Sequence, residues 1–379
     1  MRESAIKQEN NNSTTYKKSK ENATLYFFQG IACILVVLIH IPFPGTVGTF
    51  FVSLARFAVP LFYMISGYTL YRYIEGNKYK SKVADRIKKN SIVTGTALLA
   101  YLFVDIAKCI LQHESISEYL SDMVEIENIL LFLIVGIIPI SSGKVLWFIY
   151  GLVYVYVIMY VIPPQKKHVY RNAVISSVIM VLFSMAKVIF TAYPVTLAGI
   201  NLSEYWIYGN WAVIGFTSVT IGIAIAKFVE EYPEKIKTLC FYSPIIGFLC
   251  IVINFIVCFK LDLKYGMYLS YTIFTLILDL LIFVISANDF MSHGNPIVIF
   301  GKKHSRNVYL WHPIFVSLTN YAVILLKLQN TWLEAWIQPF TVIVATIIFS
   351  IILNKMSSLV NKLLKRKNEG VNKHGKMEF

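Results

Sequence analysis

The stretch that decides the fold is Leu25-Tyr-Phe-Phe-Gln-Gly-Ile-Ala-Cys-Ile-Leu-Val-Val-Leu-Ile-His40, an apolar run that ends in a histidine. A second apolar run opens with an arginine and reads Arg56-Phe-Ala-Val-Pro-Leu-Phe-Tyr-Met-Ile-Ser-Gly-Tyr68. Ionisable side chains are costly in hydrocarbon, so within a membrane span they mark a functional site by default. We therefore expect the membrane-embedded part of the protein to carry its chemistry rather than to serve as an anchor.

The composition indicates the same class of protein. Of 379 residues, 56% are hydrophobic and only 15% are charged, which is too apolar for a soluble domain to cover its surface. A span needs about 20 apolar residues and must be helical, because lipid offers the backbone no hydrogen-bond partners. We predict an all-α polytopic membrane protein of about ten transmembrane helices. The predicted spans are 25–43, 47–71, 91–112, 144–162, 170–192, 207–228, 239–260, 267–288, 306–327 and 333–354.

The basic residues orient these helices. With a cytoplasmic N-terminus, most of the 35 lysines and arginines fall in the inner segments. The outer segments carry only Lys144, Lys260, Lys264 and Lys327. This is the positive-inside bias, and it predicts that the N- and C-termini are both cytoplasmic. The net charge of +14 then reflects topology and attraction to the anionic lipid bilayer, and we expect no nucleic acid partner.

The chain divides into a membrane domain and two polar ends. We predict a disordered cytoplasmic tail over 1–22, the ten-helix membrane domain over 23–363, and a basic cytoplasmic tail over 364–379. The outer segment 113–143 turns apolar at Ile129–Ile140, which is short for a span, so we expect an interfacial or re-entrant helix there. The five cysteines form no CxxC pair and indicate no metal site.

Three ionisable residues are candidates for an outer catalytic cluster. His40 ends a polar stripe on the first helix, just before Pro42-Phe-Pro-Gly45, so we expect it at the floor of an outward opening. Arg56 lies at a similar depth on the second helix, and Asp105 on the third helix is its natural partner. The alternatives are that His40 only joins helices and that Arg56 and Asp105 form a purely structural bridge. His312, beside Pro313 in the ninth span, is interpreted as a helix-packing residue.

The inner face offers candidates for binding a phosphate group. The segment Asp85-Arg-Ile-Lys-Lys-Asn90 opens the third predicted helix, where free N–H groups and basic side chains favour anions. Ordinary anchoring at the inner face explains this charge equally well. Gln29 lies on the same stripe as His40, about 16 Å inward along the helix axis.

These segments together resemble the integral-membrane acyltransferase 3 family, over about residues 22–365. The family's first-helix signature is an Arg, ten residues and a His; here Gln29 stands at the Arg position and His40 at the His position. Its third-helix signature, two arginines three apart, appears as Arg86 and Lys89. The other matching segments are Arg56-Phe-Ala-Val-Pro-Leu-Phe…Ile-Ser-Gly-Tyr68, Leu146-Trp-Phe-Ile-Tyr150-Gly-Leu-Val-Tyr and Tyr309-Leu-Trp-His312-Pro.

The resemblance implies an O-acyltransferase of a bacterial plasma membrane. Family members move acyl groups, usually acetyl or succinyl, so the expected donor is cytoplasmic acyl-CoA, with acetyl-CoA as the simplest case and no metal. The expected acceptor is an extracytoplasmic carbohydrate or cell-envelope polymer, with polysaccharide-synthesis proteins as candidate partners. The implied roles are general base for His40 and donor binding for Gln29, Arg86 and Lys89. Either Arg56, with Asp105 as its partner, or backbone donors freed by Pro60 are then placed to stabilise the oxyanion.

Two other functions use the same sequence features. A transporter or exporter of a polysaccharide or small solute would employ the buried charges for substrate or proton coupling. A non-catalytic membrane partner of an envelope complex would tolerate Gln29 at the position of the family arginine. Turnover of radiolabelled acyl-CoA distinguishes an acyltransferase from a transporter and from a non-catalytic partner.

Overall fold

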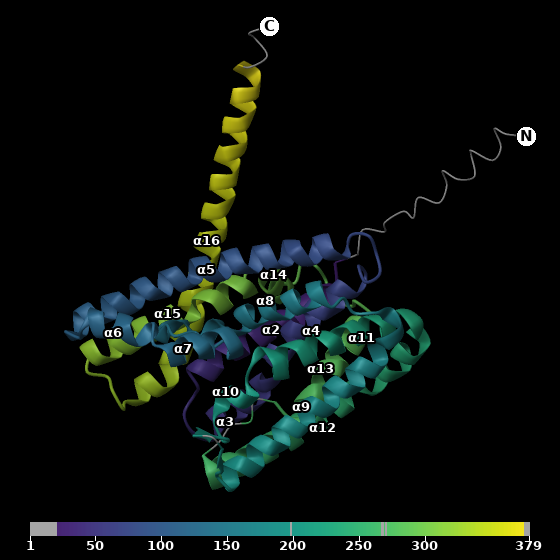
Figure 1. Ribbon diagram of the computed structural model, residues 1–379, viewed down its shortest axis with the longest axis horizontal. Helices are drawn as coiled ribbons and strands as arrows, with labels where there is room; N and C mark the ends of the chain where they lie inside the picture. Colours follow the sequence, from purple (N-terminus) through teal and green to yellow (C-terminus); the bar gives the residue numbers. More distant parts are fainter. Residues whose placement is uncertain (1–20, 198, 267–268, 270, 375–379) are drawn as a thin grey trace, which may run out of the picture.

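The protein is almost entirely helical, and its long helices pack side by side in one body (Figure 1). The structure is a computed structural model that describes residues 21–197, 199–266, 269 and 271–374. In chain order its elements are α2 (Ala23–His40), α3 (Gly45–Leu54), η1 (Ala55–Phe57), α4 (Ala58–Tyr71), α5 (Tyr79–Gln112), α6 (Ile116–Met123), α7 (Ile126–Leu130), η2 (Leu131–Val135), η3 (Ser141–Leu146), α8 (Trp147–Val161), η4 (Lys166–His168), α9 (Val169–Ala192), β1 (Thr196–Leu197), β2 (Ile200–Asn201), α10 (Tyr205–Tyr208), η5 (Trp211–Phe216), α11 (Thr217–Glu231), α12 (Pro233–Tyr265), α13 (Ile273–Ser286), α14 (Pro296–Lys303), α15 (Ser305–Leu325) and α16 (Trp332–His374).

Within the described ranges, nine helical segments are long and apolar enough to span a membrane. They correspond to nine of the ten predicted spans, which confirms the prediction of an all-α polytopic membrane protein. The tenth, predicted at 267–288, is shorter: α13 has 14 residues, and residues 267, 268 and 270 lie outside the described part. The sidedness of the termini stays a prediction.

The second predicted span is interrupted at Arg56, its charged residue. Helices α3 and α4 are joined by the short 3-10 element η1, and Arg56 is its central residue. Pro60, in the first turn of α4, has no N–H and cannot bond the carbonyl of residue 56, four positions earlier. The proline therefore accounts for the local tightening of the helix at Arg56.

Helix α5 is longer than the sequence predicted. It begins at Tyr79 rather than near residue 91 and has 34 residues, about 51 Å at 1.5 Å per residue. Arg86 and Lys89 therefore lie inside this helix, beyond its first turn. The predicted contribution of free N–H groups to phosphate binding at these two residues is wrong, because those groups belong to the turn that starts at Tyr79.

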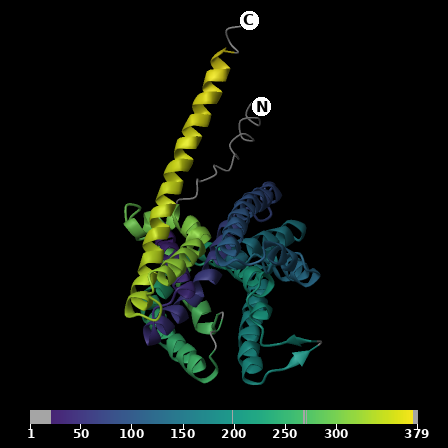
Figure 2. The same ribbon diagram turned by 90° about the vertical axis from the view of Figure 1, so that its left-hand side faces the viewer.

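The C-terminal helix also extends beyond its predicted span. Helix α16 has 43 residues and ends at His374, and its C-terminal part projects away from the other helices (Figure 2). The backbone is thus helical through 364–374, where the sequence predicted the start of the basic tail. Residues 375–379, and residues 1–20 of the predicted N-terminal tail, lie outside the described part of the chain.

Helix α2 occupies the middle of the body (Figure 1) and contacts α3, α4, α13, α14, α15 and α16. The contact with α14 is very close, because Gly30 and Gly301 face each other where the two helices meet. The segment 113–143, predicted to lie outside, contains the short helices α6 and α7, and the apolar helix Ile126–Val135 overlaps the one predicted at Ile129–Ile140. The central position of α2 lets its polar stripe face several helices at once.

Candidate functional site

Three cavities follow one another along α2. The first, of about 370 Å³, lies at the start of the helix, the second is about 180 Å³, and the third, of about 60 Å³, lies at its end. Gln29 lines both the first and the second cavity. Tyr309 lines both the second and the third. The cavities therefore form a row in which neighbours share lining side chains: Gln29 and Ile65 between the first two, and Tyr309 between the second and the third.

His40 and Arg56 lie together in the third cavity. His40 is the last residue of α2 and is exposed, and Arg56 is half-buried. The helix stops here because Pro42 and Pro44 have no N–H groups to continue it. Trp147, Tyr205 and Tyr309 complete the polar and aromatic lining. The structure thus brings together two of the three residues predicted for the outer cluster.

A second histidine, His312, lies next to His40. The ring of His312, on α15, has its centroid 5.2 Å from that of His40, with the two planes inclined by 37°. His312 is fully buried. Within the described ranges, no three His, Cys, Asp or Glu side chains gather into a group that would hold a metal ion. The sequence assigned His312 to helix packing; the signals of another role were its neighbour Pro313 and its place in one of the segments that resemble the acyltransferase 3 family.

Gln29 lies where the first two cavities meet, together with Ile65. Its amide nitrogen donates a hydrogen bond of 3.0 Å to the Ser305 hydroxyl, and that hydroxyl donates to the Gly301 carbonyl at 2.6 Å. Arg72 lines the first cavity and is exposed. The charged side chains that line the first cavity are thus Arg72 and the carboxylates Glu21 and Glu230, and Gln29 lies on its lining as well.

The membrane region as a whole matches one protein family. A family model described as an acyltransferase domain matches residues 22–355. The chain belongs to the acyltransferase 3 family. Comparison with curated proteins and with solved structures finds no match. The protein is accordingly a membrane acyltransferase, which family membership shows without specifying the acyl group or the acceptor.

In this acyltransferase, Arg86 is occupied by contacts within the protein. Its guanidinium donates to the Ser66 carbonyl at 2.8 Å, to the Tyr156 hydroxyl at 3.0 Å and to the Thr69 hydroxyl at 3.2 Å. These bonds join α4, α5 and α8. Lys89 is exposed on the same helix. The two predicted phosphate ligands therefore differ: the Arg86 guanidinium holds three helices together, whereas the Lys89 side chain is exposed to the surroundings.

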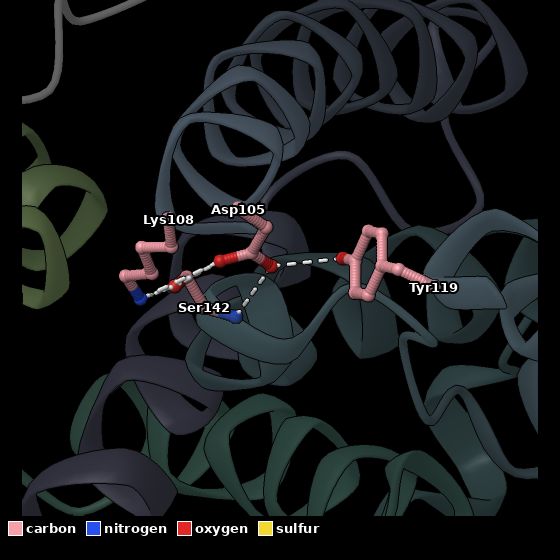
Figure 3. Close-up of polar contacts among 4 residues, drawn as sticks. All are labelled: Asp105, Lys108, Tyr119 and Ser142. Carbon is pink, nitrogen blue, oxygen red and sulfur yellow. Dashed lines mark hydrogen bonds and ion pairs between the residues drawn. The ribbon is translucent and has the colours of Figure 1, made fainter. Parts of the chain in front are cut away.

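Asp105 of the acyltransferase belongs to a separate polar cluster, shown in Figure 3. One carboxylate oxygen accepts from the Tyr119 hydroxyl at 2.9 Å and from the Ser142 amide at 3.0 Å. The other accepts from the Ser142 hydroxyl at 2.5 Å and forms an ion pair of 3.5 Å with Lys108. Tyr119 and Lys108 approach the carboxylate from opposite sides (Figure 3).

These contacts correct the predicted Arg56–Asp105 pair. The ion pair that Asp105 makes within the described ranges is with Lys108, while Arg56 lines the cavity of His40. Depth along a helix is readable from sequence, but the direction in which the side chain leaves the helix also depends on how the helix is rotated. The carboxylate of Asp105 instead fixes α5 to the segment that precedes α8.

Asp105→Asn should lower the free energy of unfolding by about 1–3 kcal/mol, because its amide hydrogens would face donors that now meet a carboxylate. Combined with Ser142→Ala, the loss should differ from the sum of the single losses by about 0.5–3 kcal/mol. Combined with Arg56→Ala, the losses should add to within about 0.5 kcal/mol. Melting curves of the purified variants in detergent measure both cycles. Coupling in the Arg56 cycle without coupling in the Ser142 cycle would contradict this assignment.

Proposed function

We propose that this acyltransferase transfers an acetyl or succinyl group from cytoplasmic acyl-CoA to a hydroxyl of an extracytoplasmic carbohydrate or envelope polymer. The supporting observation is the row of three cavities that leads along α2 to His40 and shares Gln29 and Tyr309. A long, thin thioester arm suits such a row, because the bulky charged nucleotide can stay at the first cavity. The proposed setting is a bacterial plasma membrane with both termini cytoplasmic.

His40 is the proposed general base. It removes the proton from the acceptor hydroxyl while the oxygen attacks the thioester carbonyl, a contribution of typically about 10²–10⁴-fold in rate. The carbon–sulfur bond then breaks, and the thiolate of CoA takes up the proton. Arg56 lines the same cavity and is the proposed donor to the oxyanion, where one donor is worth about 10²–10³-fold.

The donor nucleotide is proposed to bind at the mouth of the first cavity. Arg72 lines this mouth together with Glu21 and Glu230, and Lys302, which pairs with Glu21, lies beside it and 5.9 Å above the ring of Tyr26. Cations of this kind hold phosphates by charge and hydrogen bonds. Gln29 is the proposed contact to the arm of the donor, and Lys89 stays a proposed phosphate contact. Arg86 contributes by holding the Ser66 wall of the second cavity.

Arg72→Ala should raise KM for acyl-CoA about 5–10-fold and leave kcat within about twofold, because a contact remote from the reacting carbonyl contributes uniform binding. The effect should shrink with rising salt, since screening already weakens an exposed contact. Gln29→Arg should tighten CoA binding or change the preferred acyl-CoA. Lys88→Ala is the matched control on α5. Identical CoA titrations for wild type, Arg72→Ala and Gln29→Arg would show that the donor does not enter through the first cavity.

The proposed reaction is tested with purified protein in liposomes. Radiolabelled acetyl-CoA and succinyl-CoA are supplied on one side, with envelope polysaccharide as the acceptor, and both free CoA and labelled polysaccharide are measured. The expected result is equimolar release of CoA and labelling of polysaccharide, matched by an acyl mass that is lost from cells lacking the protein. Polysaccharide that crosses the membrane unlabelled would instead establish a transporter.

A further inference from the structure

The step His312-Pro313 in α15 fixes which ring nitrogen of the histidine carries hydrogen. Pro313 has no N–H, so the carbonyl of Tyr309, four residues earlier, receives no helix bond from it. His312 Nδ1 lies 2.9 Å from that carbonyl oxygen and 3.2 Å from the carbonyl oxygen of Val308. Both oxygens are acceptors only, so Nδ1 must be the donor. A neutral His312 therefore presents Nε2 as a bare acceptor.

The acceptor nitrogen Nε2 of His312 faces the elements packed against α15. Nε2 is buried and has no hydrogen-bond partner among the described residues. Because Nδ1 is turned to the backbone of α15, Nε2 points away from this helix. The ring of His40 lies 5.2 Å away, and His40 forms the exposed part of the pair. The other side chains with polar atoms in the cavity of His40 are Arg56, Trp147, Tyr205 and Tyr309.

We propose that His312 is a positioning residue for the transfer reaction, an inference that rests on the proposed function. In the reacting complex its Nε2, which has no partner in the described part of this structure, accepts a hydrogen bond from one ring nitrogen of His40, and this leaves the other nitrogen of His40 as the base toward the acceptor hydroxyl. When the acceptor O–H bond breaks, His40 gains that proton, and its bond to neutral His312 becomes charge-assisted and stronger. The proton then leaves to the thiolate of CoA, and both histidines return to their neutral forms.

Substitutions at His312 that place an acceptor at different points of the side chain test this role. In His312→Gln the amide oxygen can reach the position of Nε2, whereas in His312→Asn the amide reaches only the position of Nδ1. We expect kcat of His312→Gln to stay within about fivefold of wild type, and kcat of His312→Asn and His312→Leu to fall about 10²-fold. KM for acyl-CoA should change less than about twofold in all three, because none of these changes touches the donor path. His293→Gln, in an exposed loop, is the matched control and should equal wild type.

A second measurement does not depend on activity. Nitrogen-15 NMR of histidine-labelled protein in lipid bilayers should show one ring with hydrogen on Nδ1 and a bare Nε2, and this signal should vanish in every His312 variant. The ring signals of His40, identified by their loss in His40→Ala, should shift in His312→Asn and His312→Leu. These spectra also report on variants that fold but turn over slowly.

The outcomes separate this inference from the proposed function. The positioning role is overturned if wild type is active and the Gln and Asn variants have equal kcat. It is also overturned if the His40 ring signals keep their positions in His312→Asn and His312→Leu. In either case His312 only packs helices. If wild type transfers no acyl group from acetyl-CoA or succinyl-CoA, the proposed function fails, while the spectra still decide whether the two histidines are hydrogen-bonded.

Discussion

His40→Ala should abolish acyl transfer, with a loss in kcat of about 10²–10⁴-fold, the range expected for a general base. His40 is the last residue of α2 and is exposed at the third cavity. The helix end is fixed independently of its side chain, because the Ile41 amide bonds the Val37 carbonyl. We therefore expect the variant to insert and to melt as wild type does.

The measurement is a single-turnover assay with radiolabelled acyl-CoA on protein that elutes as one peak in detergent. The control is His293→Ala, which removes an exposed imidazole away from the cavities. Wild-type turnover by well-folded His40→Ala protein would remove His40 from the mechanism and would leave the three cavities without a base.

Gly301→Ala should be among the most damaging of the small substitutions in the membrane domain. A Cβ at this position would overlap the Tyr26 carbonyl oxygen and lie 2.9 Å from the Gly30 amide nitrogen. Both are backbone atoms, so α14 would have to move away from α2. We expect a stability loss of about 1–3 kcal/mol, the usual cost of overpacking. We also expect weaker CoA binding, because Tyr26 and Gln29 line the first cavity.

The matched control is Gly95→Ala on α5, where a Cβ would meet nothing within 4 Å. That substitution should be neutral or stabilise the helix by up to about 1 kcal/mol, because alanine is the better helix former. Melting temperatures and CoA titrations in detergent compare the two variants. If Gly301→Ala melts as Gly95→Ala does, α14 and α2 are not in fixed contact.

The membrane helices could be predicted from sequence because hydropathy depends on local composition alone. The same property explains the errors at helix ends. Residues 79–90 are too polar to count as a span, yet Lys and Arg are good helix formers, so α5 begins at Tyr79. A membrane helix and its apolar part can begin at different residues, and a hydropathy pattern shows only where the apolar part begins.

The candidate site was predictable in part for a related reason. His40 and Arg56 were expected at one depth, and they line one cavity. Asp105 was expected at that depth too, but the partners of its carboxylate are Tyr119, Ser142 and Lys108. His312 comes from a helix distant in sequence, and its contact with His40 depends on how α15 packs against α2. Sequence periodicity within one helix carries no information on that packing.

The row of cavities also bears on the permeability of the membrane. The third cavity, at about 60 Å³, has the volume of about two water molecules. Tyr309 stands between it and the second cavity, and its hydroxyl donates to the Val145 carbonyl. In the proposed reaction the donor and the acceptor arrive from opposite faces of the membrane, and a site open to both faces would conduct ions. Closure at Tyr309 and the small volume of the third cavity would let that reaction proceed without such a leak.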